Sequence, residues 1–156
     1  SKTYCMTGWR LGYVAGNAAV VSQIVKLLEF TVSHATSITQ RAAITALRDG
    51  DGFIREMQQE YRRKRDLAHE VLASIARLDV KKPRGAFYIF PRVEGLKDSF
   101  RLAKDLLLQH KVGVAPGAAF GLKGEGHIRL CFAVNDDLLL RAASALRDYL
   151  GAGCSV

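Results

Sequence analysis

Hydrophobic residues recur at helical spacing along several stretches of the chain. The longest such stretch places apolar residues from Ile54 to Ile75 on one stripe and charged residues on the other faces. This pattern predicts one helix of about six turns, which is long for a globular domain and suits an arm that connects two domains. Two shorter helices are predicted before it, one starting after the capping residue Asn17 and one over residues 38–47.

The remainder of the chain alternates between short extended segments and helices. Strands are predicted near the chain start and at three later places: residues 10–15, 86–93, 112–115 and 127–134. Helices are predicted at residues 99–109 and 136–150, the second of them capped by Asn135. From Arg84 onward this order predicts a small α/β sandwich domain, with helices over one face of a short sheet.

Composition supports a folded protein without a membrane segment. The chain has 156 residues, of which 49% are hydrophobic and 24% charged, so it can form a substantial core and is not expected to be disordered. No apolar run is long enough to cross a bilayer, and residues 1–10 do not have the pattern of a signal peptide. We therefore expect a cytoplasmic protein that does not bind a membrane.

The cysteines and the basic residues indicate no separate site. Cys5, Cys131 and Cys154 are widely spaced without a CxxC pair, so we expect mostly buried, reduced thiols and no metal site. The net charge is +8, and its densest part is the basic run at residues 62–65. Such a run can bind nucleic acid, but acidic residues at helical spacing favour a solvated helix face with ion pairs. Nucleic acid is therefore an unlikely partner.

The first residues combine a primary amine with a guanidinium. Lys2 and Arg10 are eight positions apart, and Gly8 and Gly12 allow a sharp turn and close packing around them. A lysine amine can attack a carbonyl, and an arginine can bind a phosphate through two parallel hydrogen bonds. Two cations near a chain start are usually surface residues, so this pair alone is weak evidence of a site.

The sequence around Lys2 nevertheless matches a known signature. Residues 1–13, Ser-Lys-Thr-Tyr-Cys-Met-Thr-Gly-Trp-Arg-Leu-Gly-Tyr, resemble the cofactor-lysine segment of fold-type I aminotransferases, the class I/II family. In that family the lysine forms a Schiff base with pyridoxal 5'-phosphate, and the arginine eight positions later binds the cofactor phosphate. The resemblance implies these roles for Lys2 and Arg10.

Two further stretches resemble the same family in the same order. Residues 85–91, Gly-Ala-Phe-Tyr-Ile-Phe-Pro, resemble the strand that opens the small domain of the family. Residues 114–117, the pair Phe120-Gly121 and residues 124–130 resemble its substrate-carboxylate segment, in which an arginine binds the α-carboxylate of the amino acid. The resemblance implies this substrate-binding role for Arg129.

The resemblance also implies the organisation of the chain. Residues 1–52 correspond to the C-terminal end of the large cofactor-binding domain, residues 53–80 to the long interdomain helix, and residues 81–156 to the small C-terminal α/β domain. The family active site lies at a dimer interface, and Ser33–Gln40 resemble a segment that contributes there, so a homodimer is expected. His34 and Ala35 depart from the Asn-Pro often found at comparable positions, so no site residue is assigned in this segment.

The implied reaction is transfer of an amino group between an α-amino acid and a 2-oxo acid, as in amino-acid metabolism. Much of the family's cofactor site lies upstream of the lysine, so we expect little activity from these 156 residues alone. Two alternatives stay open: a related pyridoxal-phosphate lyase, and a non-catalytic aminotransferase-like interaction domain, for example of a transcription regulator. Phe30 lies near the position of the distal-carboxylate arginine of acidic-substrate enzymes, which disfavours a strict aspartate specialist.

Overall fold

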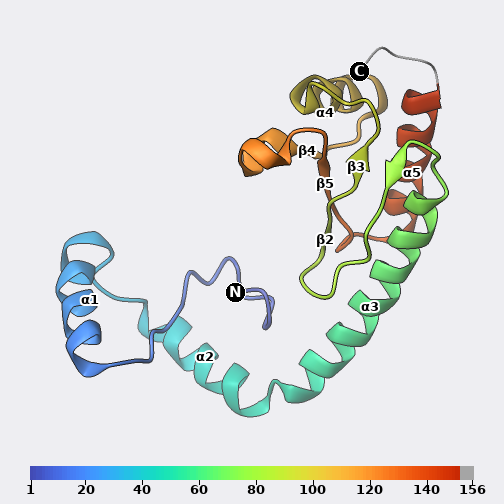
Figure 1. Cartoon of the computed structure of the whole chain (residues 1–156). Coiled ribbons are helices and arrows are strands. Elements are labelled where there is room, and N and C mark those ends of the chain that lie inside the picture. The colour runs from blue at the N-terminus through green and yellow to red at the C-terminus, as the bar shows by residue number, and fades with distance from the viewer. Residues whose placement is uncertain (152–156) are drawn as a thin grey trace. The chain divides into compact units, whose positions relative to one another are not determined.

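The computed structural model describes residues 1–151, and the chain divides into two compact units. The boundary between the units lies at Gln58–Gln59, inside the long helix α3 (Asp51–Ala73). Helices and small antiparallel sheets both contribute, which confirms the α/β class (Figure 1). The division into parts ending at residues 52 and 80 stays a prediction.

The first unit contains α1 (Ala18–Thr31), α2 (Ser37–Asp49) and the start of α3. Both short helices begin at a side chain that binds a free backbone N–H of the first turn. The Asn17 carboxamide oxygen accepts a hydrogen bond from the N–H of Ala19 at 2.9 Å, and the Thr36 hydroxyl accepts one from the N–H of Thr39 at 3.3 Å. The Asn17 cap was predicted from the sequence, whereas the Thr36 cap was not.

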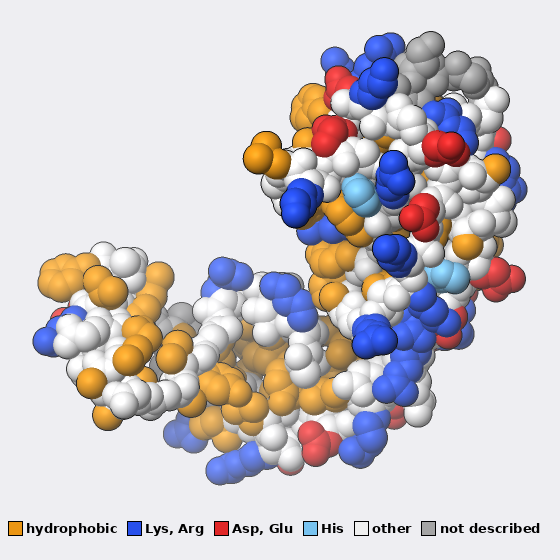
Figure 2. All heavy atoms as spheres, in the orientation of Figure 1, with side chains coloured by type: hydrophobic (Ala, Val, Ile, Leu, Met, Phe, Trp, Pro, Cys, Tyr) orange, Lys and Arg blue, Asp and Glu red, His pale blue; other side chains and the backbone are white. Residues whose placement is uncertain are grey.

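The first unit does not enclose a core of its own. No side chain in residues 1–58 is buried, and large apolar side chains lie on its surface (Figure 2). Among them are Phe30 with an exposed fraction of 88% and Tyr13 with 80%. The predicted strand at residues 10–15 is wrong, because residues 11–15 have no regular structure and Arg10 lies in a turn. A strand requires a neighbouring strand to satisfy its backbone groups, and residues 1–58 offer none.

The second unit has a continuous hydrophobic core. The later part of α3 packs with α4 (Ser99–His110), α5 (Asp136–Gly151) and the strands around residues that are almost fully buried, including Leu72, Leu102, Ile128 and Leu146. Burial of one such side chain stabilises the fold by roughly 1.5–3 kcal/mol. The Asn135 side chain begins α5 by accepting a hydrogen bond from the N–H of Leu138 at 2.9 Å, as its sequence position predicted.

In the described part of the second unit, five short strands form two small antiparallel sheets. One sheet pairs β1 (Leu78–Asp79) with β3 (Arg92–Val93), and the other has the order β2-β5-β4, with β2 at Tyr88–Ile89, β5 at Ile128–Cys131 and β4 at Ala115–Pro116. β1 was not predicted. The central strand β5 therefore connects two segments far from each other in the sequence.

The predicted strands are longer than those in the structure. The strand predicted at residues 86–93 is divided into β2 and β3, which pair with different partners. The division falls at Phe90 and Pro91, and a proline has no N–H to donate to a continuous ladder. Residues 112–114 have no regular structure, and the ladder begins only at Ala115, which pairs with Arg129.

The basic run of α3 forms ion pairs on the surface of the second unit. Within the basic run of α3, Arg63 pairs with Glu60 and Asp136 at 2.7 and 2.8 Å, and Asp66 pairs with Arg65 and Lys82 at 2.8 and 2.9 Å. The predicted ion pairing of this run with nearby acidic residues is confirmed.

The prediction of mostly buried thiols is wrong for the two cysteines that the structure describes. Cys5 and Cys131 are both exposed, and the thiol of Cys5 lies 3.8 Å from the sulfur of Met57. Cys131 is exposed because strand alternation directs it away from the core that Leu130 enters. Cys154 lies outside the described residues. Among residues 1–151, no helix is both long enough and apolar enough to span a bilayer.

Candidate active site

Lys2 lies on a segment of consecutive turns at the chain start. The carbonyl of Lys2 accepts a hydrogen bond from the N–H of Cys5 at 3.2 Å, and the carbonyl of Met6 accepts one from the N–H of Trp9 at 3.3 Å. The carbonyl of Ser1 further accepts a bond from the N–H of Met6 at 2.8 Å. The backbone around Lys2 is thus fixed by local hydrogen bonds, while its side chain is exposed.

Arg10 ends this segment in a left-handed backbone conformation, with φ of 51°. Its guanidinium donates one hydrogen bond to the carbonyl of Thr7 at 3.2 Å. Within residues 1–151, neither Lys2 nor Arg10 forms an ion pair with an acidic side chain. Two exposed cations without acidic partners on one short segment form a region that attracts anions.

Arg10 also borders a hollow of about 550 Å³ within the first unit. Apolar side chains of α1 line this hollow together with the segment before α1 and the residues that follow it. The guanidinium is therefore placed at the edge of an apolar region rather than in a polar network.

Arg129 lies on the middle strand of the three-stranded sheet. Ile128 and Leu130 are buried, so the alternation of the strand directs Arg129 to the face opposite the core. The guanidinium carbon lies 4.2 Å from the ring centroid of Tyr88 and 4.4 Å from that of Phe120. Arg129 is half-buried, and it meets these rings rather than a carboxylate.

The guanidinium of Arg129 keeps its hydrogen-bonding capacity. No oxygen atom of residues 1–151 accepts a hydrogen bond from it, and it forms no ion pair with any acidic side chain in that range. Its N–H groups lie in the guanidinium plane, and the two rings cover the guanidinium carbon. The free planar fork matches the geometry of a carboxylate, which binds such a fork through two parallel hydrogen bonds.

The loop that carries Phe120 is fixed by partly buried hydrogen bonds. Two short 3₁₀ helices, η1 (Gly117–Phe120) and η2 (Leu122–Gly124), form this loop. The Glu125 carboxylate accepts hydrogen bonds from the N–H and the hydroxyl of the buried Ser99 at 2.8 and 3.2 Å. The Ser99 hydroxyl in turn accepts one from the N–H of Ala118 at 3.1 Å. These bonds tie the start of α4 to both ends of the loop.

The charge of Glu125 is stabilised by the same contacts. The N–H of Gly126 donates to its carboxylate at 2.9 Å, and this bond, followed by those from Ser99, holds the pKa of Glu125 below its ordinary value of 4.5. Glu125 is therefore an ionised structural acceptor at neutral pH, and it does not face the guanidinium of Arg129 as a counter-ion.

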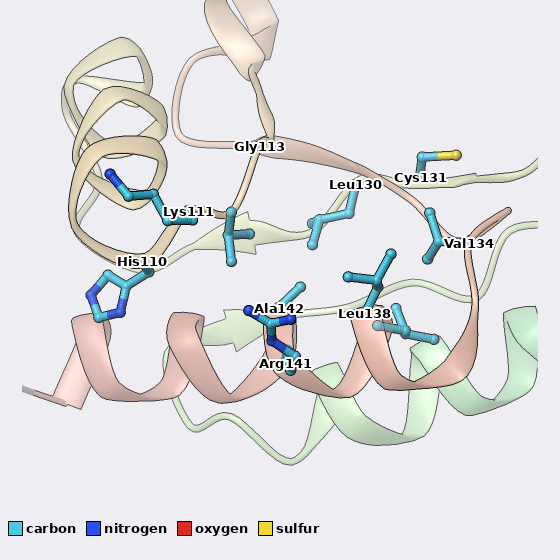
Figure 3. A pocket seen from close by; sticks show the side chains of 11 residues that line it. His110, Lys111, Gly113, Leu130, Cys131, Val134, Leu138, Arg141 and Ala142 are labelled. Atoms are coloured by element: carbon cyan, nitrogen blue, oxygen red, sulfur yellow. The ribbon is translucent and has the colours of Figure 1, made fainter.

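Another hollow, in the second unit, contains no predicted site residue. It has a volume of about 240 Å³ and lies between the end of α4, the strand β5 and the helix α5 (Figure 3). Apolar side chains of Leu130, Val134 and Leu138 face it, whereas the thiol of Cys131 points away. The amine of Lys111 donates a hydrogen bond to the carbonyl of Leu108 at 3.0 Å.

The three predicted site residues fall in two units. Lys2 and Arg10 belong to the same segment of the first unit, and Arg129 belongs to the second. Tyr88 and Phe120 were part of the matched sequence stretches, but no role was predicted for them. Alternation on β2 and β5 would have placed Tyr88 on the same face of the sheet as Arg129. No sequence pattern indicated that Phe120 contacts the same arginine.

The donor groups fit a cofactor that has a carbonyl and a phosphate. Lys2 offers an exposed primary amine without an acidic partner, and Arg10 offers a guanidinium with a single backbone acceptor. An amine can form a covalent bond with an aldehyde, and a guanidinium suits a phosphate. These are the two attachments to pyridoxal 5'-phosphate that the family resemblance implies for this segment.

Comparison with known proteins gives a consistent result. The family described as aminotransferase class I and II matches residues 1–146. An aspartate aminotransferase of Pyrococcus horikoshii is 36% identical over 153 residues, which cover 96% of this chain and 39% of that protein. The chain therefore spans about two fifths of the length of such relatives.

Solved structures agree with the sequence match. The crystal structure of an aromatic aminotransferase from Pyrococcus horikoshii superposes with a TM-score of 0.91 at 37% identity, covering 100% of this chain and 42% of that one. An aspartate aminotransferase from Thermus thermophilus with maleate gives a TM-score of 0.87 at 31% identity, covering 95% of this chain and 39% of that one. The chain belongs to the class I and II aminotransferases, a family of enzymes that depend on pyridoxal 5'-phosphate.

Proposed function

We propose that this chain supplies the cofactor lysine and two anion-binding arginines of an aminotransferase that moves an amino group between an α-amino acid and a 2-oxo acid. The single observation that carries the proposal is the family match over residues 1–146, which includes Lys2, Arg10 and Arg129. The aspartate and aromatic aminotransferases among its relatives support the reaction class.

Each residue has a role that follows from its chemistry. Lys2 binds the cofactor through its side-chain amine, and Arg10 binds the cofactor phosphate through its guanidinium. When bound, pyridoxal 5'-phosphate supplies an electron sink for the charge that develops at the substrate Cα. The amine of Lys2, once free, would accept the proton from Cα as a base and then donate it, as an acid, to the cofactor carbon that carried the aldehyde.

Arg129 orients the substrate through its α-carboxylate. The support is the unoccupied N–H edge of its guanidinium, which is flanked by Tyr88 and Phe120 and has no acidic partner among residues 1–151. Maleate, named with the Thermus thermophilus enzyme, is itself a carboxylate compound. Bidentate binding by a half-buried arginine fixes both the position and the orientation of a planar group.

The proposal extends to the state of the protein. We expect a homodimer in the cytoplasm, and the exposed apolar side chains of the first unit support an association that covers them. We also expect little turnover from the 156 residues alone, because they span about two fifths of the relatives' length.

A chimera tests the function. This chain would replace the matched 42% of the Pyrococcus horikoshii aromatic aminotransferase, and the products from one amino acid and 2-oxoglutarate would be identified. We expect a new 2-oxo acid and glutamate, and loss of both with Lys2→Ala. Ammonia and pyruvate as the products would indicate an elimination reaction, and full activity of Lys2→Ala would contradict the role of Lys2.

A further inference from the structure

The two rings around Arg129 come from separate parts of the second unit. Tyr88 belongs to β2 and is opposite Cys131 in the ladder, so it lies diagonally from Arg129 on the same face of the sheet. Phe120 is the last residue of η1, in the loop that follows β4. The guanidinium therefore contacts two rings that tertiary structure brings to it, and neither ring is a neighbour in sequence.

Aromatic rings and carboxylates affect an arginine differently. A carboxylate and a ring each stabilise the cation. A carboxylate occupies the N–H groups and neutralises the charge, whereas a ring contacts the flat face and leaves the N–H groups and the charge available to a ligand. Centroid distances of 4.2 and 4.4 Å are well inside the roughly 6 Å over which this attraction acts. Two rings against one guanidinium thus limit the orientation of its plane and leave its N–H groups free to bind a ligand.

Phe120 is itself supported by further rings. Its centroid lies 5.6 Å from that of Phe90 in an edge-to-face arrangement, and Phe90 stacks on His127 with centroids 5.0 Å apart and an interplanar angle of 7°. Such aromatic contacts have preferred geometries, so they limit rotation of the Phe120 ring. The Ser99–Glu125 hydrogen bonds hold the backbone of the same loop.

We propose that Tyr88 and Phe120 are positioning residues that clamp the guanidinium of Arg129 so that its free N–H edge is presented to the substrate carboxylate. This inference rests on the proposed function of Arg129. It adds that the affinity for the carboxylate depends on the two flanking rings and not only on the arginine charge. Neither tyrosine hydroxyl chemistry nor a direct contact of either ring with the substrate is required.

The test measures carboxylate binding by the 156-residue chain. Arginine side chains are labelled with ¹⁵N, and the Arg129 Nε–H signal is assigned by its loss in Arg129→Lys. Ring currents from two stacked rings should move this signal to higher field in the wild type. Titration with maleate then gives the dissociation constant at Arg129, and sodium chloride at equal ionic strength controls for screening.

The variants separate ring stacking from general packing. Tyr88→Leu and Phe120→Leu each remove one ring, and we expect each to weaken maleate binding by about two- to fivefold and to move the Nε–H signal downfield. Tyr88→Phe and Phe120→Tyr retain the rings and should retain both the affinity and the shift. Phe100→Leu is the matched control, because Phe100 is exposed and does not stack on Arg129.

The outcomes distinguish the clamp from the role of Arg129. Unchanged maleate affinity and an unchanged Nε–H shift in both leucine variants would overturn the clamp and leave carboxylate binding by Arg129 intact. No response of the Arg129 signal to maleate in the wild type would overturn both ideas. Melting curves by circular dichroism confirm that each variant is folded, and Phe120→Met replaces Phe120→Leu if the latter unfolds.

Discussion

The loop that carries Phe120 depends on two glycines in direct backbone contact. A Cβ atom added to Gly117 would lie 1.9 Å from the carbonyl oxygen of Gly124, 2.4 Å from that of His127 and 2.9 Å from the His127 carbonyl carbon. All three neighbours are backbone atoms, so no side-chain rotation can relieve the overlap. We therefore predict that Gly117→Ala distorts this loop.

The loss of stability caused by Gly117→Ala follows from the backbone movement that the new Cβ atom requires. Real Cβ atoms essentially never approach such atoms closer than 3.0 Å, so the backbones must separate by roughly 1 Å. That separation strains the hydrogen bond from the N–H of Gly117 to the carbonyl of His127, which is 2.9 Å long. Overpacking costs about 1–3 kcal/mol and the lost bond about 0.5–1.5 kcal/mol, which together give a destabilisation of about 1.5–4.5 kcal/mol.

Thermal unfolding of the chain, followed by far-ultraviolet circular dichroism, measures this cost. For a chain of 156 residues the expected loss lowers Tm by roughly 3–18 °C. Gly113→Ala is the matched control, since Gly113 lies in the connection between α4 and β4 and a Cβ there meets no atom within 4 Å. Its expected effect is within about 0.5 kcal/mol. Equal Tm values for the two alanine variants would refute the argument.

Three further predictions follow from the same geometry. In the chimera, Arg129→Ala should raise the KM for the amino acid far more than the dissociation constant of the cofactor, measured by absorbance titration. Unfolding titrations should show stability lost as pH falls below 4.5, because the folded-state pKa of Glu125 lies below that value, and Glu125→Gln should reduce this loss. The unextended 156-residue chain should show little transaminase turnover in a coupled assay, and readily measured turnover would contradict this expectation.

The sign of the pH effect follows from the hydrogen bonds at Glu125. A carboxylate whose pKa is lower in the folded state contributes its full stability above the unfolded-state pKa and loses it as pH falls through the folded-state pKa. Asp66, Glu60 and Asp136 behave alike, with the pKa of Asp66 lowered to about 2 by hydrogen bonds from Arg65 and Lys82. Glu125→Gln therefore removes one part of the acid response, and an unchanged pH profile would count against the Ser99–Glu125 contacts.

Helices were predictable from the sequence because their signals are local. The apolar stripe of α3 and the caps at Asn17 and Asn135 all lie within a few residues of the elements they define. The strands are only two to four residues long, and their limits depend on distant partners: β5 pairs with both β2 and β4. Pro91 was visible in the sequence, but the exchange of partners on either side of it was not.

For the candidate site, the residues were predictable from the sequence, but the surroundings of Arg129 were not. The resemblance to class I and II aminotransferases indicated Lys2, Arg10 and Arg129, because spacing within a short motif is preserved in the sequence itself. The environment of Arg129 depends instead on contacts across the fold, since Phe120 reaches it from η1 and Tyr88 from β2. The exposure of Cys131 follows from the same strand alternation that directs Arg129 away from the core, and the average burial of cysteine was a poor guide to it.

Covalent labelling of the cofactor lysine is the most direct test of the proposed function. The chimera is incubated with pyridoxal 5'-phosphate, reduced with borohydride, digested and mapped by mass spectrometry. We predict that the pyridoxyl group is found on Lys2 and that Lys2→Ala abolishes specific labelling. A label on any other lysine of this chain, with Lys2 unmodified, would contradict the proposed role of Lys2.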